Sequence, residues 1–204
     1  MKKIASINEF VIKFANVNGS GSASANQMFA KGVFRMGIPV SPKNIFPSNI
    51  QGLPTWFEVR VNEKGYLGRR DGVDIAVIMN PQSYNQDIKE LIPGGYLIYD
   101  SSWERNFDRT DINVIGIPII KMCQEKFTNI KQRQLFKNIV YVGALAALLD
   151  IDIEVYKGLI SEQFQGKEKL IEPNIDIIFT NEGVYSLWNI LILNDYLNKY
   201  FNLI

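Results

Sequence analysis

Apolar and polar positions follow regular spacings along most of the chain, and these spacings predict strands and helices in turn. Residues 10–17 and 73–79 are mostly apolar runs, which is typical of strands buried on both faces of a parallel sheet. From Ala25 to Met36 small or apolar positions recur at intervals of three and four, which predicts one face of a helix, and Gly37 follows where a helix cap is expected. Residues 132–149 form the strongest helical pattern. Its predicted buried stripe consists of Leu135, Phe136, Ile139, Val140, Gly143, Ala146 and Ala147.

Prolines and glycines divide the segment that follows the first predicted helix. Residues 38–54 hold four of the eight prolines, which excludes a helix and predicts an exposed, shaped loop. Residues 55–61 and 65–70 flank Asn62-Glu63-Lys64, and we expect them to form a β-hairpin closed by Gly65.

The second half of the chain continues the alternation of strands and helices. Asn80 and Pro81 are expected as the N-cap and first residue of a helix that the Pro-Gly-Gly at 93–95 ends. Residues 96–102 and 113–119 are predicted strands. Asp152 is expected to cap a helix that runs through Phe164. Together these elements predict a three-layer α/β fold: a mainly parallel sheet with helices on both faces and a β-hairpin excursion.

Composition narrows the chemistry that the chain can perform. Its 204 residues are 47 % hydrophobic and 21 % charged, which suits one globular domain. The net charge of +1 argues against nucleic-acid or membrane-surface partners. Without histidine there can be no histidine-based triad or histidine metal site. The single cysteine, Cys123, excludes an internal disulfide, and we expect it to be buried and inert.

No sorting feature stands out at the start of the chain. The opening MKKIASINEFVIKF lacks the unbroken apolar segment and small-residue cleavage site of a signal peptide. No stretch approaches the roughly 18 apolar residues that a membrane-spanning helix needs. We therefore expect a cytoplasmic protein without a membrane partner.

The most suggestive motif is NGSGSASAN at 18–26, between the first strand and the first helix. Gly19 and Gly21 permit positive φ angles, and amides at a helix N-terminus attract anions. The motif is neither GxGxxG nor a P-loop, because serine stands at the third glycine position and no lysine follows. Two interpretations stay open: an anion cradle, or a plain turn in which Ser22 or Ser24 caps the helix.

A second candidate is the loop at 48–60, SNIQGLPTWFEVR. Asn49, Gln51 and Gly52 could contact a ligand, and Arg60 could be directed at a phosphate. From the residues alone, a salt-bridged and solvated face with Glu58 is favoured instead, since residues two apart on a strand share a face.

Other charged residues carry less information. Lys64, Arg69 and Arg70 form a basic group that usually serves solubility but could also meet an anionic ligand or an acidic partner. The aspartates lack metal-ligand spacing and are interpreted as turn and cap residues; they are Asp71, Asp74, Asp100, Asp108 and Asp111. We therefore predict no catalytic residue and no metal ligand, and chemistry alone indicates a binding or assembly domain.

Taken in order, five segments resemble a known family: VNGSGSASANQMFAKGVFRMG, FPSNIQGLPTWFEVRV, GVDIAVIMNP, GGYLIYDSS and RQLFKNIVYVGALAALLDID. They are similar to the γ domain of 2-oxoacid:acceptor oxidoreductases, the pyruvate/ketoisovalerate oxidoreductase catalytic-domain family. The nearest variant is the γ domain that opens the α subunit of 2-oxoglutarate:ferredoxin oxidoreductase. The family favours GxGGQG where this chain has Gly19 to Ser24, and often Arg-Gly-Gly where it has Gln51-Gly52-Leu53.

The resemblance implies a division of labour within a larger enzyme. That enzyme oxidatively decarboxylates a 2-oxoacid on thiamine diphosphate, passes electrons through iron–sulfur clusters to ferredoxin, and gives the acyl group to coenzyme A. The γ domain is expected to help bind coenzyme A and to pack against other domains or subunits, while thiamine diphosphate and the clusters lie elsewhere. Coenzyme A would then contact Gly19, Ser20, Gly21, Ser22, Asn49, Gln51, Gly52 and Arg60. By itself this chain is predicted to be inactive.

The resemblance also implies a boundary near residue 182. Residues 1–182 correspond to the γ-type domain, and residues 183–204 form an unmatched C-terminal tail whose helical pattern is apolar around much of its circumference. We expect a truncated or split α subunit rather than a freestanding γ subunit. The alternative is an independent nucleotide-binding or assembly module with unrelated partners.

Overall fold

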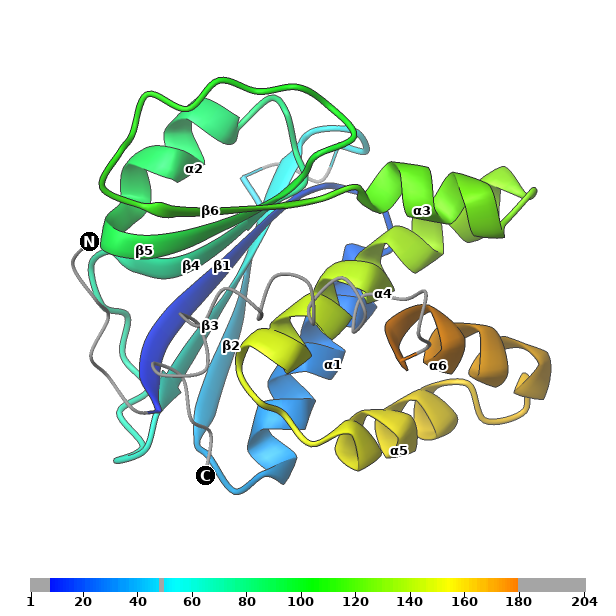
Figure 1. Ribbon diagram of the computed structural model, residues 1–204. Helices are drawn as coiled ribbons and strands as arrows, with labels where there is room; N and C mark the ends of the chain where they lie inside the picture. Colours follow the sequence, from blue (N-terminus) through cyan, green and yellow to red (C-terminus); the bar gives the residue numbers. More distant parts are fainter. Residues whose placement is uncertain (1–7, 48–49, 180–204) are drawn as a thin grey trace.

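A mixed six-stranded sheet forms the centre of the computed structural model, which describes residues 8–47 and 50–179 (Figure 1). The strand order is β2-β3-β1-β4-β5-β6. Its strands are β1 (Glu9–Val17), β2 (Val40–Ile45), β3 (Pro54–Asn62), β4 (Val73–Ile78), β5 (Leu91–Asp100) and β6 (Asn113–Ile117). Strands β1, β4, β5 and β6 are parallel, whereas β3 runs antiparallel to both of its neighbours.

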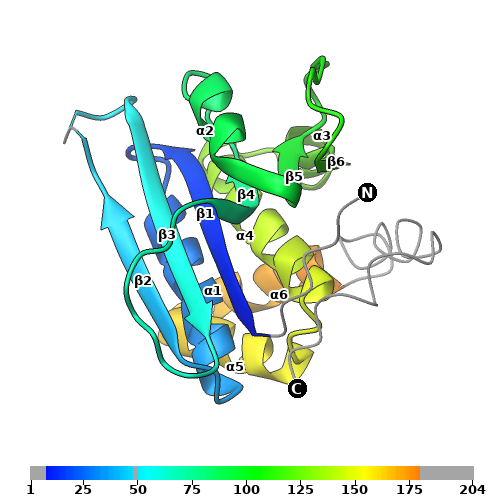
Figure 2. The same cartoon turned by 90° about the vertical axis from the view of Figure 1, so that its left-hand side faces the viewer.

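Helices cover the two faces of this sheet unequally. They are α1 (Ser22–Arg35), α2 (Tyr84–Glu90), α3 (Ile119–Lys126), α4 (Ile130–Leu148), α5 (Ile153–Gln163), the short 3₁₀ helix η1 (Glu168–Leu170) and α6 (Ile171–Phe179). Of the described helices, only α2 lies on the second face, while α1 and α4 lie on the first (Figures 1 and 2). Helices α5 and α6 pack on α1 and α4 and so add to the first layer. The predicted three-layer α/β fold with helices on both faces is confirmed.

The main core lies between the first face of the sheet and helices α1 and α4. Phe14 of β1 is fully buried, and its ring centroid is 5.6 Å from that of Phe29, 6.2 Å from Phe57 and 5.7 Å from Tyr141. Val77 and Ile139 are also buried, as the periodicity predicts. The predicted interior strands and the helices over 25–36 and 132–149 are thereby confirmed.

The antiparallel end of the sheet differs from the sequence prediction. The hairpin joins β2 to β3, so the proline-rich segment contains a strand that we expected to be loop. Residues 65–70 form no strand; although the turn at Gly65 exists, with its amide donating to the Asn62 carbonyl at 2.9 Å, the chain then crosses to β4 (Figure 2). Because β3 is already paired on both edges, it has no free edge for a third partner.

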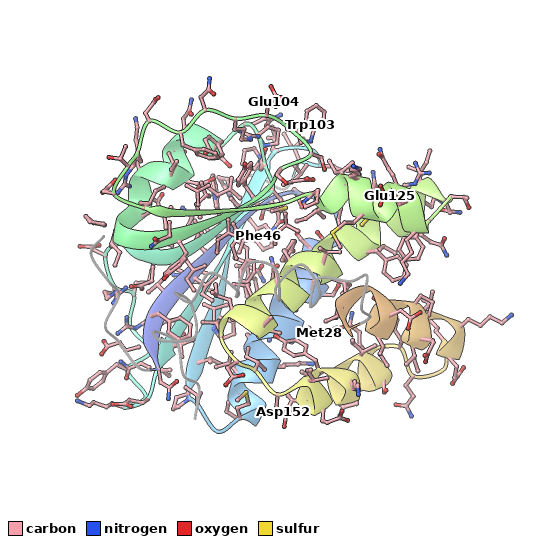
Figure 3. The ribbon with its side chains drawn as sticks, viewed as in Figure 1. Met28, Phe46, Trp103, Glu104, Glu125 and Asp152 are labelled. Atoms are coloured by element: carbon pink, nitrogen blue, oxygen red, sulfur yellow. The ribbon has the colours of Figure 1, made fainter. Side chains whose placement is uncertain are left out.

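Helix boundaries show smaller differences. Helix α2 begins at Tyr84 rather than at Pro81. Residues 81–83 form a turn, in which the Asn80 side chain accepts from the Gln82 amide at 2.9 Å. The Pro-Gly-Gly segment lies within β5. Leu135 is 55 % exposed and does not belong to the buried stripe of α4. The Asp152 cap of α5 is confirmed, since its Oδ1 accepts from the Glu154 amide at 2.8 Å, and the residue lies in the turn before that helix (Figure 3).

Candidate functional site

The glycine-containing loop after β1 lies at the carboxyl edge of the parallel strands. Gly19 and Gly21 have φ angles of 83° and 74°, so both use the left-handed region that glycine favours. The Asn18 amide donates to the Leu53 carbonyl at 2.8 Å, and the Gly52 amide donates to the Asn18 carbonyl at 3.0 Å. These bonds join the two loops, which confirms that both lie on the same edge of the sheet, where open α/β sheets bind ligands.

The start of α1 carries no side-chain cap. Gly21 occupies the N-cap position, and Ser24 Oγ donates to the Gly21 carbonyl at 3.2 Å rather than accepting from an amide. Of the two interpretations left open by the sequence, the one in which Ser22 or Ser24 caps this helix is therefore wrong. The first turn also has no acidic residue. Its amides keep the electropositive character that attracts an anion.

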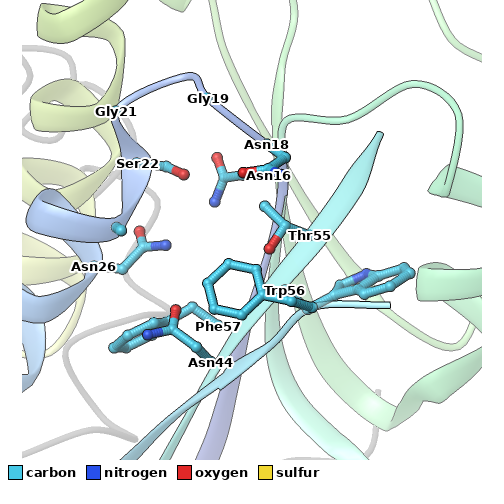
Figure 4. Close-up of a pocket in the computed structure, with 12 residues that line it drawn as sticks. Asn16, Asn18, Gly19, Gly21, Ser22, Asn26, Asn44, Thr55, Trp56 and Phe57 are labelled. Carbon is cyan, nitrogen blue, oxygen red and sulfur yellow. The ribbon is translucent and has the colours of Figure 1, made fainter. Parts of the chain in front are cut away.

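A cavity of about 290 Å³ opens beside this helix start (Figure 4). The end of β1, the first turns of α1 and the antiparallel strands β2 and β3 supply its walls. The lining consists of Asn16, Asn18, Gly19, Gly21, Ser22, Ala23, Asn26, Asn44, Phe46, Thr55, Trp56 and Phe57. None of these residues is charged, and four are asparagines, so the cavity offers hydrogen bonds and aromatic surface without a fixed ion.

Two buried asparagines form the inner part of this cavity. Tyr141 donates its hydroxyl to Asn26 Oδ1 at 2.8 Å, so the Nδ2 group of Asn26 is turned toward the cavity (Figure 4). Burial raises the pKa of Tyr141, which keeps the hydroxyl protonated as a donor. The Asn16 side chain lowers the pKa of Tyr141, but burial has the larger effect. The Nδ2 group of Asn16 has no acceptor in hydrogen-bond geometry within the described residues. An acceptor on a ligand would satisfy this buried donor.

Helix α4 holds the glycine loop in place from the other side. Asn138 Nδ2 donates to the Ser20 carbonyl at 3.0 Å. A Cβ atom on Gly21 would lie 3.0 Å from Leu135 Cδ2, and a Cβ atom on Gly19 would lie 2.8 Å from Gln51 Cγ. The loop is therefore packed closely on both sides, and a larger residue would require the Leu135 side chain to move at Gly21 and the Gln51 side chain to move at Gly19.

The structure brings together most, but not all, of the residues that the sequence suggested. Gly19, Ser20, Gly21 and Ser22 form the loop and helix start, and Gln51 and Gly52 lie against it. Asn49 lies outside the described residues.

Arg60 is at the wrong end of the sheet for this site. It pairs across β1 with Val11, whereas Thr55 at the cavity pairs with Asn16. The reason is that β3 is antiparallel to β1, so its last residues reach the amino end of β1. There Arg60 Nη2 donates to Glu9 Oε1 at 3.0 Å. The expectation that Arg60 belongs to the same anion site is corrected accordingly.

Two of the other predicted cations, Arg69 and Arg70, form ion pairs with buried carboxylates on the second face. Arg69 contacts Glu58 through two bonds of 3.0 and 2.8 Å, and Arg70 pairs with Asp74. Glu58 and Asp74 are almost fully buried, so the expected solvated face is wrong. Asp74 is neither a turn nor a cap residue: it lies in β4, accepts from the Val11 amide at 2.7 Å, and burial raises its pKa.

Sequence reasoning missed the asparagines that line the cavity. Asn16 is a polar residue inside the apolar run 10–17, and Asn26 occupies the buried face of α1. A polar side chain at a position that the periodicity assigns to the core indicates either an internal partner or a ligand. Asn44 and Thr55 gave no such indication, because the strand that contains Asn44 was not predicted.

The arrangement is suited to binding rather than to catalysis. The cavity supplies donors from Asn16, Asn26 and the first turn of α1, and it contains no acid, base or nucleophile of shifted pKa. Among the described residues no three potential metal ligands gather, and one cysteine cannot hold an iron–sulfur cluster. Within the described part of the chain, no helix is long and apolar enough to cross a membrane.

Comparison with protein families identifies the domain. Residues 11–180 match the family described as pyruvate ferredoxin/flavodoxin oxidoreductase. The chain belongs to this family. The α subunit of 2-oxoacid:ferredoxin oxidoreductase 2 from Aeropyrum pernix is 21 % identical over 78 % of this chain and 31 % of its own length. Subunit KorA of 2-oxoglutarate oxidoreductase from Mycobacterium tuberculosis is 22 % identical over 81 % of this chain and 29 % of its own. The chain thus spans about a third of these relatives.

Solved structures of this oxidoreductase family share the fold. A 2-oxoglutarate:ferredoxin oxidoreductase from Magnetococcus marinus, with 2-oxoglutarate, coenzyme A and succinyl-CoA bound, superposes with a TM-score of 0.75 at 24 % identity, over 84 % of this chain and 30 % of that one. The γ subunit of a keto/oxoacid ferredoxin oxidoreductase from Geobacter sulfurreducens superposes with a TM-score of 0.66 at 18 % identity, over 82 % and 92 %. The fold of this domain therefore occurs in one solved structure as part of a longer chain and in another as a separate subunit.

Proposed function

We propose that this chain is the γ-type component of a thiamine-diphosphate-dependent 2-oxoacid:ferredoxin oxidoreductase that acts on 2-oxoglutarate. Its contribution is to bind coenzyme A and to assemble with the domains or subunits that hold thiamine diphosphate and the iron–sulfur clusters. The family match over residues 11–180 carries this proposal. The relative KorA and the Magnetococcus structure, whose names specify 2-oxoglutarate, favour that substrate.

The geometry of the glycine loop supports a role in coenzyme A binding. Uncapped amides at the start of α1 suit a diphosphate, since helix N-termini stabilise anions. The adjoining uncharged cavity, with the Asn16 and Asn26 donors, suits the carbonyl groups of the pantetheine arm. In this arrangement Gly19, Ser20, Gly21 and Ser22 contact phosphate oxygens, with Gln51 and Gly52 beside them; Asn49 is retained as a proposed contact of the same loop.

A matched pair of glycine variants tests the binding site. Gly21→Ala adds a Cβ atom 3.0 Å from Leu135 at a φ of 74°, whereas Gly37→Ala adds one at a φ of 84° with no atom within 4 Å. Both variants carry backbone strain, but only Gly21 lies in the loop that is proposed to bind the diphosphate. Isothermal titration calorimetry should show that coenzyme A binds the wild type and Gly37→Ala alike and binds Gly21→Ala at least about ten-fold more weakly, the equivalent of about 1.4 kcal/mol. Absence of coenzyme A binding to the wild type would contradict the proposal.

Assembly provides the second test, and it separates the proposal from the alternative of an independent nucleotide-binding or assembly module. The purified chain alone should not reduce a viologen dye with 2-oxoglutarate and coenzyme A. Co-purification from the native cell should recover subunits that carry thiamine diphosphate and iron–sulfur clusters, and that assembly should reduce ferredoxin. Turnover by the isolated chain, or recovery of unrelated partners only, would contradict the proposed role.

A further inference from the structure

A second cavity, of about 210 Å³, lies between α3 and the first half of α4. Arg133 and Lys137 line it from α4, where a separation of four residues places them on one face of the helix. Gln124 and Gln134 contribute amide groups, and Cys123 is part of the lining. The cavity thus combines two cations with two amides.

Most arginines of the domain are paired with a carboxylate. Arg35, Arg60, Arg69, Arg70 and Arg109 each form an ion pair with a carboxylate. Within the described ranges, neither Arg133 nor Lys137 has such a pair. Two like charges one helical turn apart repel each other, so their placement at one cavity costs stability unless an anion joins them.

The Arg133 guanidinium is held ready for a ligand. Its Nε donates to the Phe127 carbonyl at 2.6 Å, which fixes the plane of the group. The fork of an arginine matches the oxygens of a phosphate in a bidentate manner. Burial raises the pKa of Cys123 to about 12, so its neutral thiol adds no negative charge that would compete with an anion.

We propose that this cavity binds a phosphate monoester dianion through Arg133 and Lys137, with Gln124 and Gln134 as further polar contacts. A dianion neutralises both cations, and its three terminal oxygens match the number of donors better than a carboxylate does. Nothing in this assignment requires the glycine loop to be occupied.

The dianion could come from two sources. Helix α4 links the cavity to the glycine loop, because Asn138 contacts Ser20 and Leu135 packs beside Gly21. One nucleotide could therefore place its diphosphate at the loop and a separate phosphate monoester at this cavity, as coenzyme A would with its 3′-phosphate. That version rests on the proposed function. The other source is an independent small phosphate ester.

The site is tested with inorganic phosphate as the probe. In ¹⁵N-edited NMR titrations of the full chain, phosphate should cause saturable shifts of amides in α3 and the first turns of α4. The shifts should be lost in Arg133→Gln/Lys137→Gln and retained in Lys131→Gln, which removes one positive charge from the same helix at a position outside the cavity. Thermal melts establish that each variant folds; if the double variant does not, Lys137→Gln alone should weaken the phosphate response. Wild-type shifts that are absent, or that persist in the folded cavity variant, would overturn the proposal.

Coenzyme A and its 3′-dephospho form then identify the source. If the nucleotide supplies the dianion, the cavity variant should lose at least about ten-fold in affinity for coenzyme A and little for the dephospho form, since hydrogen bonds to charged groups contribute more than neutral ones. If coenzyme A binds wild type and cavity variant equally while phosphate binding is lost, the source is a separate ester and the cavity assignment still holds. Failure of coenzyme A to bind at all, with the phosphate response intact, would contradict the proposed function alone.

Discussion

The two faces of the sheet bury their side chains by different means. On the first face β1 presents Phe14 to an apolar layer that includes Phe29 and Tyr141. On the second face the neighbouring residue of the same strand, Lys13, is just as inaccessible, but it is charged. Apolar partners can be exchanged for others of similar volume, whereas a buried charge needs its specific counter-charge. The difference teaches that one face of this sheet tolerates repacking and the other depends on individual pairs.

The charge pairs of the second face connect the sheet to α2. Lys13 Nζ lies 2.7 Å from Glu90 Oε2 and 3.4 Å from Asp87 Oδ1. Trp56 Nε1 donates to Asp87 Oδ1 at 2.7 Å, and the Lys13 ammonium lies 5.2 Å from the centroid of the Trp56 ring. Charged groups thus help to anchor this short helix of seven residues to the sheet.

The largest effect is expected on the apolar face. Phe14→Ala removes a fully buried ring that contacts three other aromatic side chains, and should lower the free energy of unfolding by about 3–5 kcal/mol. Urea denaturation followed by circular dichroism measures this change. Phe14→Leu, which keeps most of the volume, should cost clearly less; equal losses would mean that packing is not the cause.

A somewhat smaller loss, with a distinctive rescue, is expected on the charged face. Lys13→Met leaves Asp87 buried without its cation and should cost about 3 kcal/mol. Adding Asp87→Asn removes the unpaired charge while an amide oxygen can still accept from Trp56, so the double variant should recover part of the loss. If the double variant is as unstable as the sum of the two single variants, the two residues are not coupled.

The dependence of stability on pH tests the charged face separately, because a buried carboxylate of that face changes its protonation state. Burial raises the folded-state pKa of Asp74 above its ordinary value of 3.8, so the folded state binds this proton more tightly than the unfolded state. Protonation of Asp74 therefore stabilises the folded state most fully below pH 3.8, and this stabilisation is lost as the pH rises through the folded-state pKa. Asp74→Asn lacks this stabilisation, so the stability of the wild type relative to this variant should increase as pH falls toward 3.8. Denaturant midpoints at several pH values test this, and an opposite slope would mean that the Arg70 pair outweighs burial.

The smallest effect is expected where an ion pair is exposed to water. Arg35 of α1 and Glu162 of α5 are 2.5 Å apart, but both side chains are open to solvent. Exposed pairs contribute little because water and salt screen them. Glu162→Gln should leave the thermal midpoint unchanged within error at physiological salt. A clear decrease in the thermal midpoint would mean that this exposed ion pair contributes to stability as the buried pairs do.

The first face was largely predictable from sequence, and the second was not. Apolar periodicity placed Phe14, Val77 and Ile139 correctly, because hydrophobic burial depends on residue type and spacing. Periodicity could not predict that Glu58 is buried, because charged residues are usually exposed. Its ion pair with Arg69 depends on the path of the chain after β3, which the spacing of apolar residues does not specify. For the same reason β2, with its proline and lysine, was mistaken for a loop.

Part of the candidate site could also be predicted from the sequence, and part could not. The glycine loop followed from local rules about left-handed turns and helix starts, so Gly19 and Gly21 could be recognised. Asn44 and Thr55 reach the cavity through the antiparallel pairing of β2 and β3, which no local pattern predicted. Arg60 was misassigned because the direction of β3 relative to β1 decides which end of the sheet it reaches.

The composition of β2 has a consequence for behaviour at high concentration. An outermost strand with free amides and carbonyls can recruit a strand of another molecule and so begin an aggregate. Here the outermost position carries Pro42, which lacks an amide hydrogen, and Lys43, whose charge would be desolvated by an incoming chain. Pro42 and Lys43, which made β2 hard to predict from the sequence, thus disfavour the addition of further strands at this edge of the sheet.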